Sequence, residues 1–154
     1  SEVCGLAIWG NHSSTQFPDF FHATISGRPV GEMIDDDEWL HDQFIPMVQQ
    51  RGAEIIKARG QSSAASAANA VIDTVHEITQ PSGETFSAAV PSSGGDQAYG
   101  VPEGIVFGYP LRATAPGRVE IVQGISHGEW ARARIEATLN ELLEERDAVQ
   151  ELLP

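Results

Sequence analysis

The order of strand-like and helix-like segments along the chain narrows the choice of fold more than any other feature of the sequence. Short apolar runs bounded by turn residues indicate strands, and apolar residues at helical spacing indicate helices. Strand patterns lie at residues 5–9, 20–25, 85–90, 105–111 and 118–122, and helix patterns at 35–60, 63–80 and 127–149. Two strands that could pair, a helix pair, three strands and a last helix predict an α+β fold with a mostly antiparallel sheet.

Local signals place the ends of the predicted helices. Asp35 to Glu38 has the pattern of a helix start, and Gly60 is a plausible C-terminal cap. Pro46 falls inside this first pattern, so we expect a kink or an interruption there. The second helix is expected to begin near Ser62 or Ser63 and to stop at Pro81.

Composition limits the class of protein. The 154 residues fit one domain, and 41% of them are hydrophobic, which suffices for a core. The net charge of −13 argues against nucleic acid and anionic membranes as general partners. No apolar run approaches the roughly 20 residues of a membrane helix, and the start lacks a secretory signal, so a cytoplasmic location is expected. The single cysteine, Cys4, excludes an internal disulfide and is expected to be an inert core thiol.

Gly124 to Gly128 matches the G-x-S-x-G motif of serine hydrolases around Ser126. The histidine that should follow an acid later in the chain is lacking, because His127 is the only histidine after Ser126. We therefore expect Ser126 to cap the last helix, with Glu129 completing a capping box. The spacing of the five histidines matches no metal-binding motif, and neither a P-loop nor a G-x-G-x-x-G turn is present.

His12 follows a predicted buried strand and lies in a polar loop. An imidazole titrates near neutral pH, so a positioned histidine can transfer protons there. On position alone, a surface residue is the commoner explanation for a histidine in such a loop.

Several segments resemble malate dehydrogenases of the branch that includes the cytosolic NAD enzymes. Residues 9–16 (WGNHSSTQ) are similar to the catalytic-histidine segment of that family. The similarity extends in order through residues 49–53, 55–59, 62–68 and 99–102, and so covers essentially the whole chain.

The resemblance implies a reaction and a set of site residues. These enzymes interconvert malate and oxaloacetate with NAD(H), and His12 would accept the proton of the malate hydroxyl and return it in reverse. Arg51 and Gly52 match a segment near the substrate pocket, and Ser63 matches a position that faces the substrate. The same resemblance implies that Asn11 contacts the cofactor. Without it, Ser63 would be explained as a helix cap and Arg51 as a surface or structural ion-pairing residue.

The resemblance also implies that residues 1–154 are a single C-terminal substrate domain, and that the N-terminal nucleotide-binding domain is absent. NAD would be bound mainly by that domain, and the full enzyme would be a homodimer. The arginines that clamp the substrate and the aspartate that orients His12 would also lie in that domain. The present chain opens almost directly on a predicted strand, which is typical of a cut at a domain boundary. We therefore expect the isolated chain to be inactive.

Other readings stay open at the level of sequence. A non-catalytic acidic interaction module could keep the same fold, and lactate dehydrogenases are close relatives of the malate enzymes. A serine hydrolase at Ser126 is the third alternative. The residues that would distinguish NAD from NADP lie outside this chain.

Overall fold

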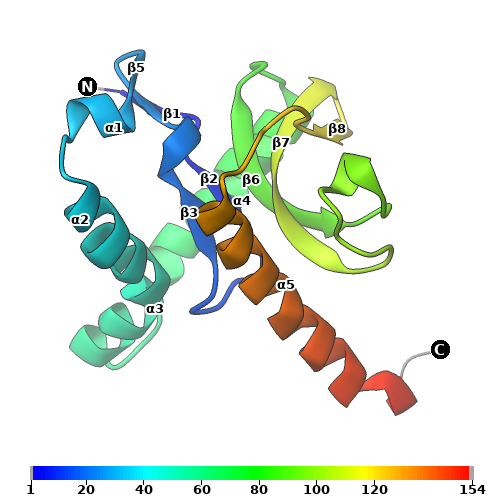
Figure 1. Cartoon of the computed structure of the whole chain (residues 1–154). Helices are drawn as coiled ribbons and strands as arrows, with labels where there is room; N and C mark the ends of the chain where they lie inside the picture. Colours follow the sequence, from blue (N-terminus) through cyan, green and yellow to red (C-terminus); the bar gives the residue numbers. More distant parts are fainter. Residues whose placement is uncertain (1, 153–154) are drawn as a thin grey trace.

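The computed structural model describes residues 2–152 and has an α+β architecture, which confirms the predicted fold class (Figure 1). Its strands are β1 (Val3–Cys4), β2 (Ala7–Trp9), β3 (Phe17–Asp19), β4 (Thr24–Ile25), β5 (Arg28–Pro29), β6 (Thr85–Pro91), β7 (Val106–Ala115) and β8 (Arg118–Ile121). Its α-helices are α1 (Val30–Met33), α2 (Asp37–Trp39), α3 (Ile45–Arg59), α4 (Ala64–Thr79) and α5 (Glu129–Ala148). Short helical turns are η1 (Phe20–His22), η2 (Leu40–Phe44), η3 (Asp96–Ala98) and η4 (Gln150–Leu152).

The strands pair antiparallel throughout the described residues. β6, β7 and β8 form one sheet in that order, β2 pairs with β3, and β1, β4 and β5 form a small third sheet. A single backbone bridge between Gly10 and Gly108 joins the end of β2 to β7. This bridge connects the two halves of the strand arrangement at the start of the loop that carries His12.

The core lies where β2, β3 and β7 meet. Trp9, Phe17, Phe107, Tyr109 and Leu111 are essentially inaccessible to solvent. Each such side chain contributes about 1.5–3 kcal/mol by its removal from water. The indole of Trp9 also packs edge-on against the ring of Tyr109, with a centroid separation of 6.1 Å.

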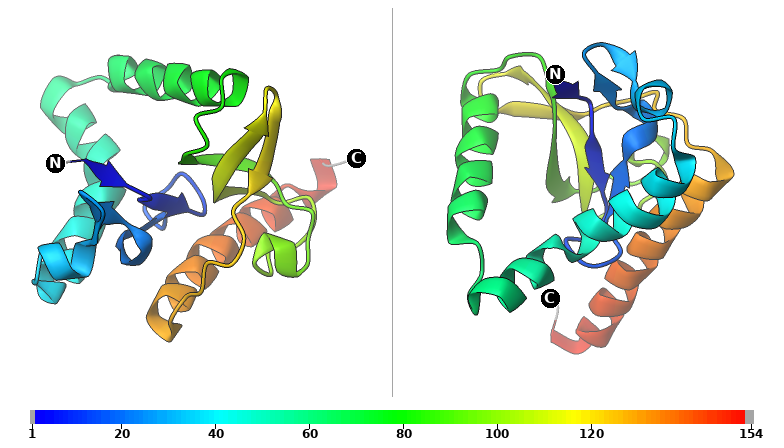
Figure 2. Two further views of the ribbon diagram at one scale, coloured as in Figure 1. Left: turned by 90° about the horizontal axis from the view of Figure 1, so that it is seen from above. Right: turned by 90° about the vertical axis from the view of Figure 1, so that its left-hand side faces the viewer.

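The helices flank the strands on two sides. In the right view of Figure 2 the strands lie between α4 on one side and α5 on the other. Ile135, Leu139, Leu142 and Leu143 of α5 pack against the core, as the apolar stripe of this helix predicts. Within residues 2–152, no helix is both long and apolar enough to cross a membrane.

The interruption expected at Pro46 is present as a π-helical turn. Leu40–Phe44 forms this turn directly before α3, and Pro46 occupies the first turn of α3. Proline has no backbone N–H, so the α-helical bond to the Asp42 carbonyl cannot form, and the chain shifts register instead. The expected end of α3 is confirmed, because Gly60 is left-handed with φ of 70°.

The strand expected at residues 20–25 is wrong over its first half. Phe20–His22 forms the 3₁₀ turn η1, because the Asp19 carboxylate accepts a hydrogen bond from the Phe21 N–H and starts a turn. The strand that pairs with β2 is β3, three residues earlier. Cys4 is also exposed rather than a core thiol, because β1 lies at the edge of the small sheet.

The expected capping role of Ser126 is wrong as well. Helix α5 begins at Glu129 with Gly128 as its N-terminal cap, and no side chain caps it. Residues 122–128 are irregular, so Ser126 lies too far before the helix to reach its first N–H groups.

Candidate active site

The loop that carries His12 begins at a position that only glycine can occupy. Gly10 has φ of 96°, and a Cβ atom added there would lie 2.1 Å from the Thr138 methyl group of α5. Gly10 N–H donates to the Gly108 carbonyl at 3.1 Å, and Gly108 N–H donates back at 2.9 Å. The close contact of strand, strand and helix therefore fixes where the loop leaves β2.

Helix α5 binds the residues of the His12 loop that follow Gly10. The Asn11 backbone N–H donates to Thr138 Oγ1 at 2.8 Å, and the hydroxyls of Ser13 and Thr15 both donate to the Glu141 carboxylate. These bonds fix the residues on either side of His12, while the imidazole itself is exposed. His12 is thus presented on a loop whose backbone is anchored at both flanks.

The anchoring carboxylate is stabilised in its ionised form. Hydrogen bonds from Ser13 and Thr15 lower the pKa of Glu141 from its ordinary value, and Asn11 adds to this effect, while burial opposes it. At neutral pH the group is a carboxylate with acceptor capacity only, as its three donors require.

His12 lines a pocket of about 180 Å³ between its loop and the strands β6 and β7. The walls come from small or uncharged residues: Ile8, Gly10, Asn11, Gln16, Ser87, Ala88, Ala89 and Gly108. His12 is the one titratable side chain among these described lining residues. The pocket has room for a small substrate, but it is smaller than the 300–1,000 Å³ of pockets that hold drug-sized ligands, so these residues alone do not fit a dinucleotide.

The other residues predicted for the site do not line this pocket. Arg51 and Gly52 are exposed on α3, and Ser63 is the half-buried residue before α4. Ser63 occupies the N-terminal cap position of α4, but its side chain accepts no hydrogen bond from a backbone N–H of the helix. Their roles as substrate contacts stay predictions. Helix α3 does reach the loop, since Gln49 Nε2 donates to the Gln16 carbonyl at 2.8 Å.

Asn11 lies at the pocket but is also engaged elsewhere. Its side-chain amide donates to Glu141 at 3.1 Å and to Glu145 at 3.0 Å. Only its amide oxygen is left for another group, so a contact of Asn11 with a cofactor stays a prediction.

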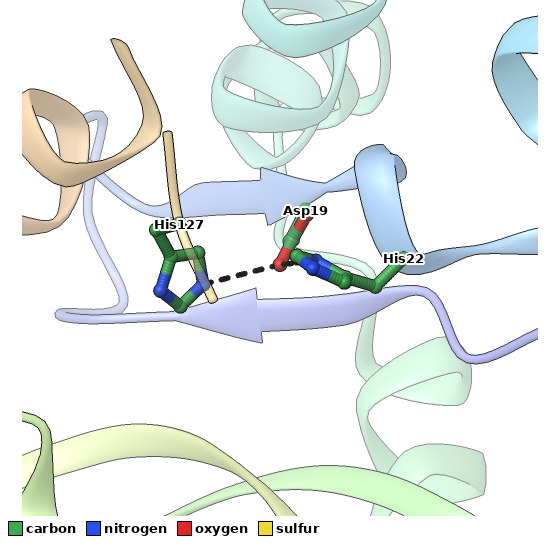
Figure 3. Close-up of side chains that lie close together, drawn as sticks. All are labelled: Asp19, His22 and His127. Atoms are coloured by element: carbon green, nitrogen blue, oxygen red, sulfur yellow. Dashed lines mark hydrogen bonds and ion pairs between the residues drawn. The ribbon is translucent and has the colours of Figure 1, made fainter. Parts of the chain in front are cut away.

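The structure brings together a second group of titratable residues that the sequence did not indicate. Asp19, His22 and His127 come from the end of β3, from η1 and from the segment before α5 (Figure 3). His22 and Asp19 are three residues apart, but His127 is more than a hundred residues away, so no local spacing could have revealed the group. Within the described residues, no hydrogen bond joins Ser126 to a histidine, whereas an activated serine nucleophile is expected to make one.

The fold, with antiparallel strands between α4 and α5 (Figure 2), is that of the C-terminal domain of lactate/malate dehydrogenases. A family model described as the lactate/malate dehydrogenase alpha/beta C-terminal domain matches residues 2–153. The chain belongs to this family.

Solved structures agree with this assignment. Malate dehydrogenase from Naegleria fowleri is 44% identical and superposes with a TM-score of 0.89, and the match covers 98% of this chain and 45% of that one. Lactate dehydrogenase from Trichomonas vaginalis, in complex with NADH and oxamate, is 27% identical with a TM-score of 0.88 over 97% of this chain and 46% of that one. The chain therefore spans less than half the length of these relatives.

Proposed function

We propose that this chain is the substrate domain of a malate dehydrogenase, in which His12 transfers the proton between the substrate and the protein. The observation that carries the proposal is the presentation of His12 in the pocket on a loop anchored to α5, in a chain that is 44% identical to a malate dehydrogenase. The lactate dehydrogenase at 27% identity is the more distant of the two relatives, which favours malate.

His12 would act as general base and general acid. With malate in the pocket, the imidazole takes the hydroxyl proton as the carbon is oxidised, and in reverse it returns that proton to the carbonyl oxygen of oxaloacetate. The protonated imidazole also attracts the carboxylates of the substrate. NAD, bound by the nucleotide-binding half of the enzyme, is proposed to accept the hydride.

The pocket supports the expectation that the chain alone is inactive. A dicarboxylate carries two negative charges, and His12 is the one group on the described pocket wall that can become positive. The exposed imidazole also receives no carboxylate partner from the described residues to fix its tautomer. Further cations and an orienting acid would have to come from the other half of the enzyme. A homodimeric state of the full enzyme and a cytoplasmic location stay predictions.

The test mixes this chain with a separately produced nucleotide-binding half of a related malate dehydrogenase and follows NADH oxidation with oxaloacetate. We expect activity that needs both parts and that falls about 10²–10⁴-fold in His12→Ala, the usual contribution of general acid–base catalysis. Ser14→Ala, an exposed neighbour in the same loop, is the matched control and should keep full activity.

A parallel assay with pyruvate in place of oxaloacetate distinguishes a malate dehydrogenase from a lactate dehydrogenase, because only the latter is expected to prefer pyruvate. A mixture that forms a complex but shows no activity with either substrate would contradict the enzymatic proposal and favour the non-catalytic acidic module.

A further inference from the structure

The group of Asp19, His22 and His127 lies at the edge of the core and outside the pocket of His12, with Asp19 buried and His22 exposed. His22 Nδ1 lies 2.8 Å from Asp19 Oδ2, and His127 Nε2 lies 3.4 Å from the same oxygen (Figure 3). One ligand atom from each residue lies within 4.8 Å of the other two. The group therefore presents two imidazole nitrogens and one carboxylate oxygen to a common point.

His127 has a buried nitrogen without a hydrogen-bond partner. Its side chain is only 6% exposed, and Nε2 makes no hydrogen bond, because its approach to Asp19 lacks hydrogen-bond geometry. The ring is held in this orientation by edge-on packing against Trp9, with centroids 4.8 Å apart. Buried polar atoms are nearly always paired, so an unpaired nitrogen directed at a carboxylate indicates a missing partner.

Asp19 is oriented as a metal-binding carboxylate would be. Its Oδ1 accepts the Phe21 N–H at 3.1 Å, and its Oδ2 accepts the Trp9 Nε1–H at 3.3 Å. These two bonds fix the carboxylate plane and leave further acceptor capacity on Oδ2 directed at the histidines. Burial favours the neutral acid, but the His127 and His22 imidazoles outweigh it and hold the pKa of Asp19 below its ordinary value.

We propose that Asp19, His22 and His127 bind one divalent transition-metal ion of the zinc class. Two imidazoles and a carboxylate suit Zn²⁺ and its neighbours, whereas Mg²⁺ and Ca²⁺ prefer all-oxygen sites. With metal–ligand bonds of about 2.0–2.2 Å, ligand atoms in a tetrahedron lie about 3.4 Å apart. The separation of Asp19 and His127 already has this value, and that of Asp19 and His22 widens once the metal replaces their hydrogen bond.

The proposed metal site lies apart from His12 and joins three separate segments, so its role is structural. The His22 side chain is 35% exposed, so an ion would enter from that side, where solvent can complete its coordination. The bound ion would tie β3, η1 and the segment before α5 together without touching His12. The proposal does not depend on the proposed function.

The experiment is equilibrium dialysis of the 154-residue chain against micromolar ZnCl₂, with metal content measured afterwards. His127→Phe keeps an aromatic ring against Trp9 and removes the ligand nitrogen, and His22→Gln removes the other imidazole at a partly exposed position. His76→Gln, an exposed histidine on α4, is the matched control. Circular dichroism and thermal unfolding verify that each variant is folded.

We expect one zinc per chain for the wild type and His76→Gln, and at least about tenfold weaker binding for both ligand variants. Zinc-edge X-ray absorption of the wild type should show two imidazoles. If His127→Phe does not fold, His22→Gln alone decides. Less than one zinc per chain in the wild type at micromolar metal, or equal affinity in the wild type and His22→Gln, would overturn the proposal.

Discussion

At the scale of single residues, Gly10 explains how the His12 loop is placed. Two independent constraints act on this glycine: a backbone φ of 96° and the contact with Thr138. Most glycines at turns satisfy the first constraint alone. Gly27, in the turn between β4 and β5, has φ of 81° but nothing within 4 Å of an added Cβ.

This difference predicts unequal costs of two alanine substitutions. Gly27→Ala should cost about 1–2 kcal/mol, the penalty of a left-handed non-glycine residue. Gly10→Ala adds a clash with α5 and should cost more than about 3 kcal/mol in the free energy of unfolding. Urea denaturation of both variants at 25 °C measures this. Equal losses would mean that Thr138 moves away freely and that the contact does not fix the loop.

At the scale of elements, α5 acts as the support of the candidate active site. Its inward face supplies apolar packing, and one turn of the same face supplies Thr138 and Glu141 to the loop. The sequence indicated the helix and its apolar stripe correctly. It could not indicate that polar residues on this helix bind a loop 126 residues earlier in the chain.

Removal of the Glu141 charge should loosen the loop. In Glu141→Gln we expect amide hydrogens of residues 13–16 to exchange about fivefold faster, which corresponds to about 1 kcal/mol of local stability from hydrogen bonds to the carboxylate. Glu144→Gln, an exposed position on the same helix, is the control. Hydrogen exchange followed by mass spectrometry measures the exchange rates in both variants. Unchanged exchange in Glu141→Gln would show that Thr138 holds the loop without Glu141.

The lowered pKa of Glu141 predicts a pH dependence with a definite sign. A carboxyl whose pKa is lower in the folded state contributes its full stability above its unfolded value of about 4.3, and the contribution disappears as the pH falls through the folded value. The difference in Tm between wild type and Glu141→Gln should therefore be constant from pH 7 to about pH 5 and shrink below pH 4. Thermal unfolding across this range measures it, and a difference that grows on acidification would contradict the assignment.

At the scale of the whole molecule, α4 presents an apolar surface to solvent. Val71, Ile72 and Val75 are 62%, 64% and 53% exposed, and they follow the small residues at the start of the helix. The relatives are about twice as long as this chain, and Ser63 at the start of α4 is a predicted substrate contact. Under the proposed function a nucleotide-binding half lies beside this chain, and we expect that half to cover the exposed apolar surface of α4.

Val71→Asp should therefore affect assembly and not folding. We expect a change in unfolding free energy within about 0.5 kcal/mol, as for other exposed positions, together with weaker association of the two halves. Met33→Asp, at an exposed apolar residue of α1, is the control. Sedimentation of the mixture and of the chain alone measures association. Unchanged binding of the two halves would contradict packing of the nucleotide-binding half on α4. If Val71→Asp instead abolishes self-association of the chain, a second copy of the chain covers this surface.

The sequence by itself determined the long helices, the β7–β8 hairpin and the position of the candidate catalytic residue in a loop after a strand. The ends of α3, α4 and the β7–β8 hairpin follow from proline, glycine and apolar spacing, because these signals act within a few residues. The motif around His12 pointed to its family for the same reason, since it is a contiguous segment.

Only the tertiary structure decided which strand pairs with β2, that Cys4 is exposed and that Gly128 rather than Ser126 caps α5. It alone brought His127 to Asp19 and His22, and Glu141 to the His12 loop. The positions of His127 and Glu141 depend on contacts between residues far apart in the chain, and the exposure of Cys4 depends on which edge of a sheet is covered. Local propensity carries no information about such contacts, because they form only when the packing of the whole core fixes the distance between distant segments.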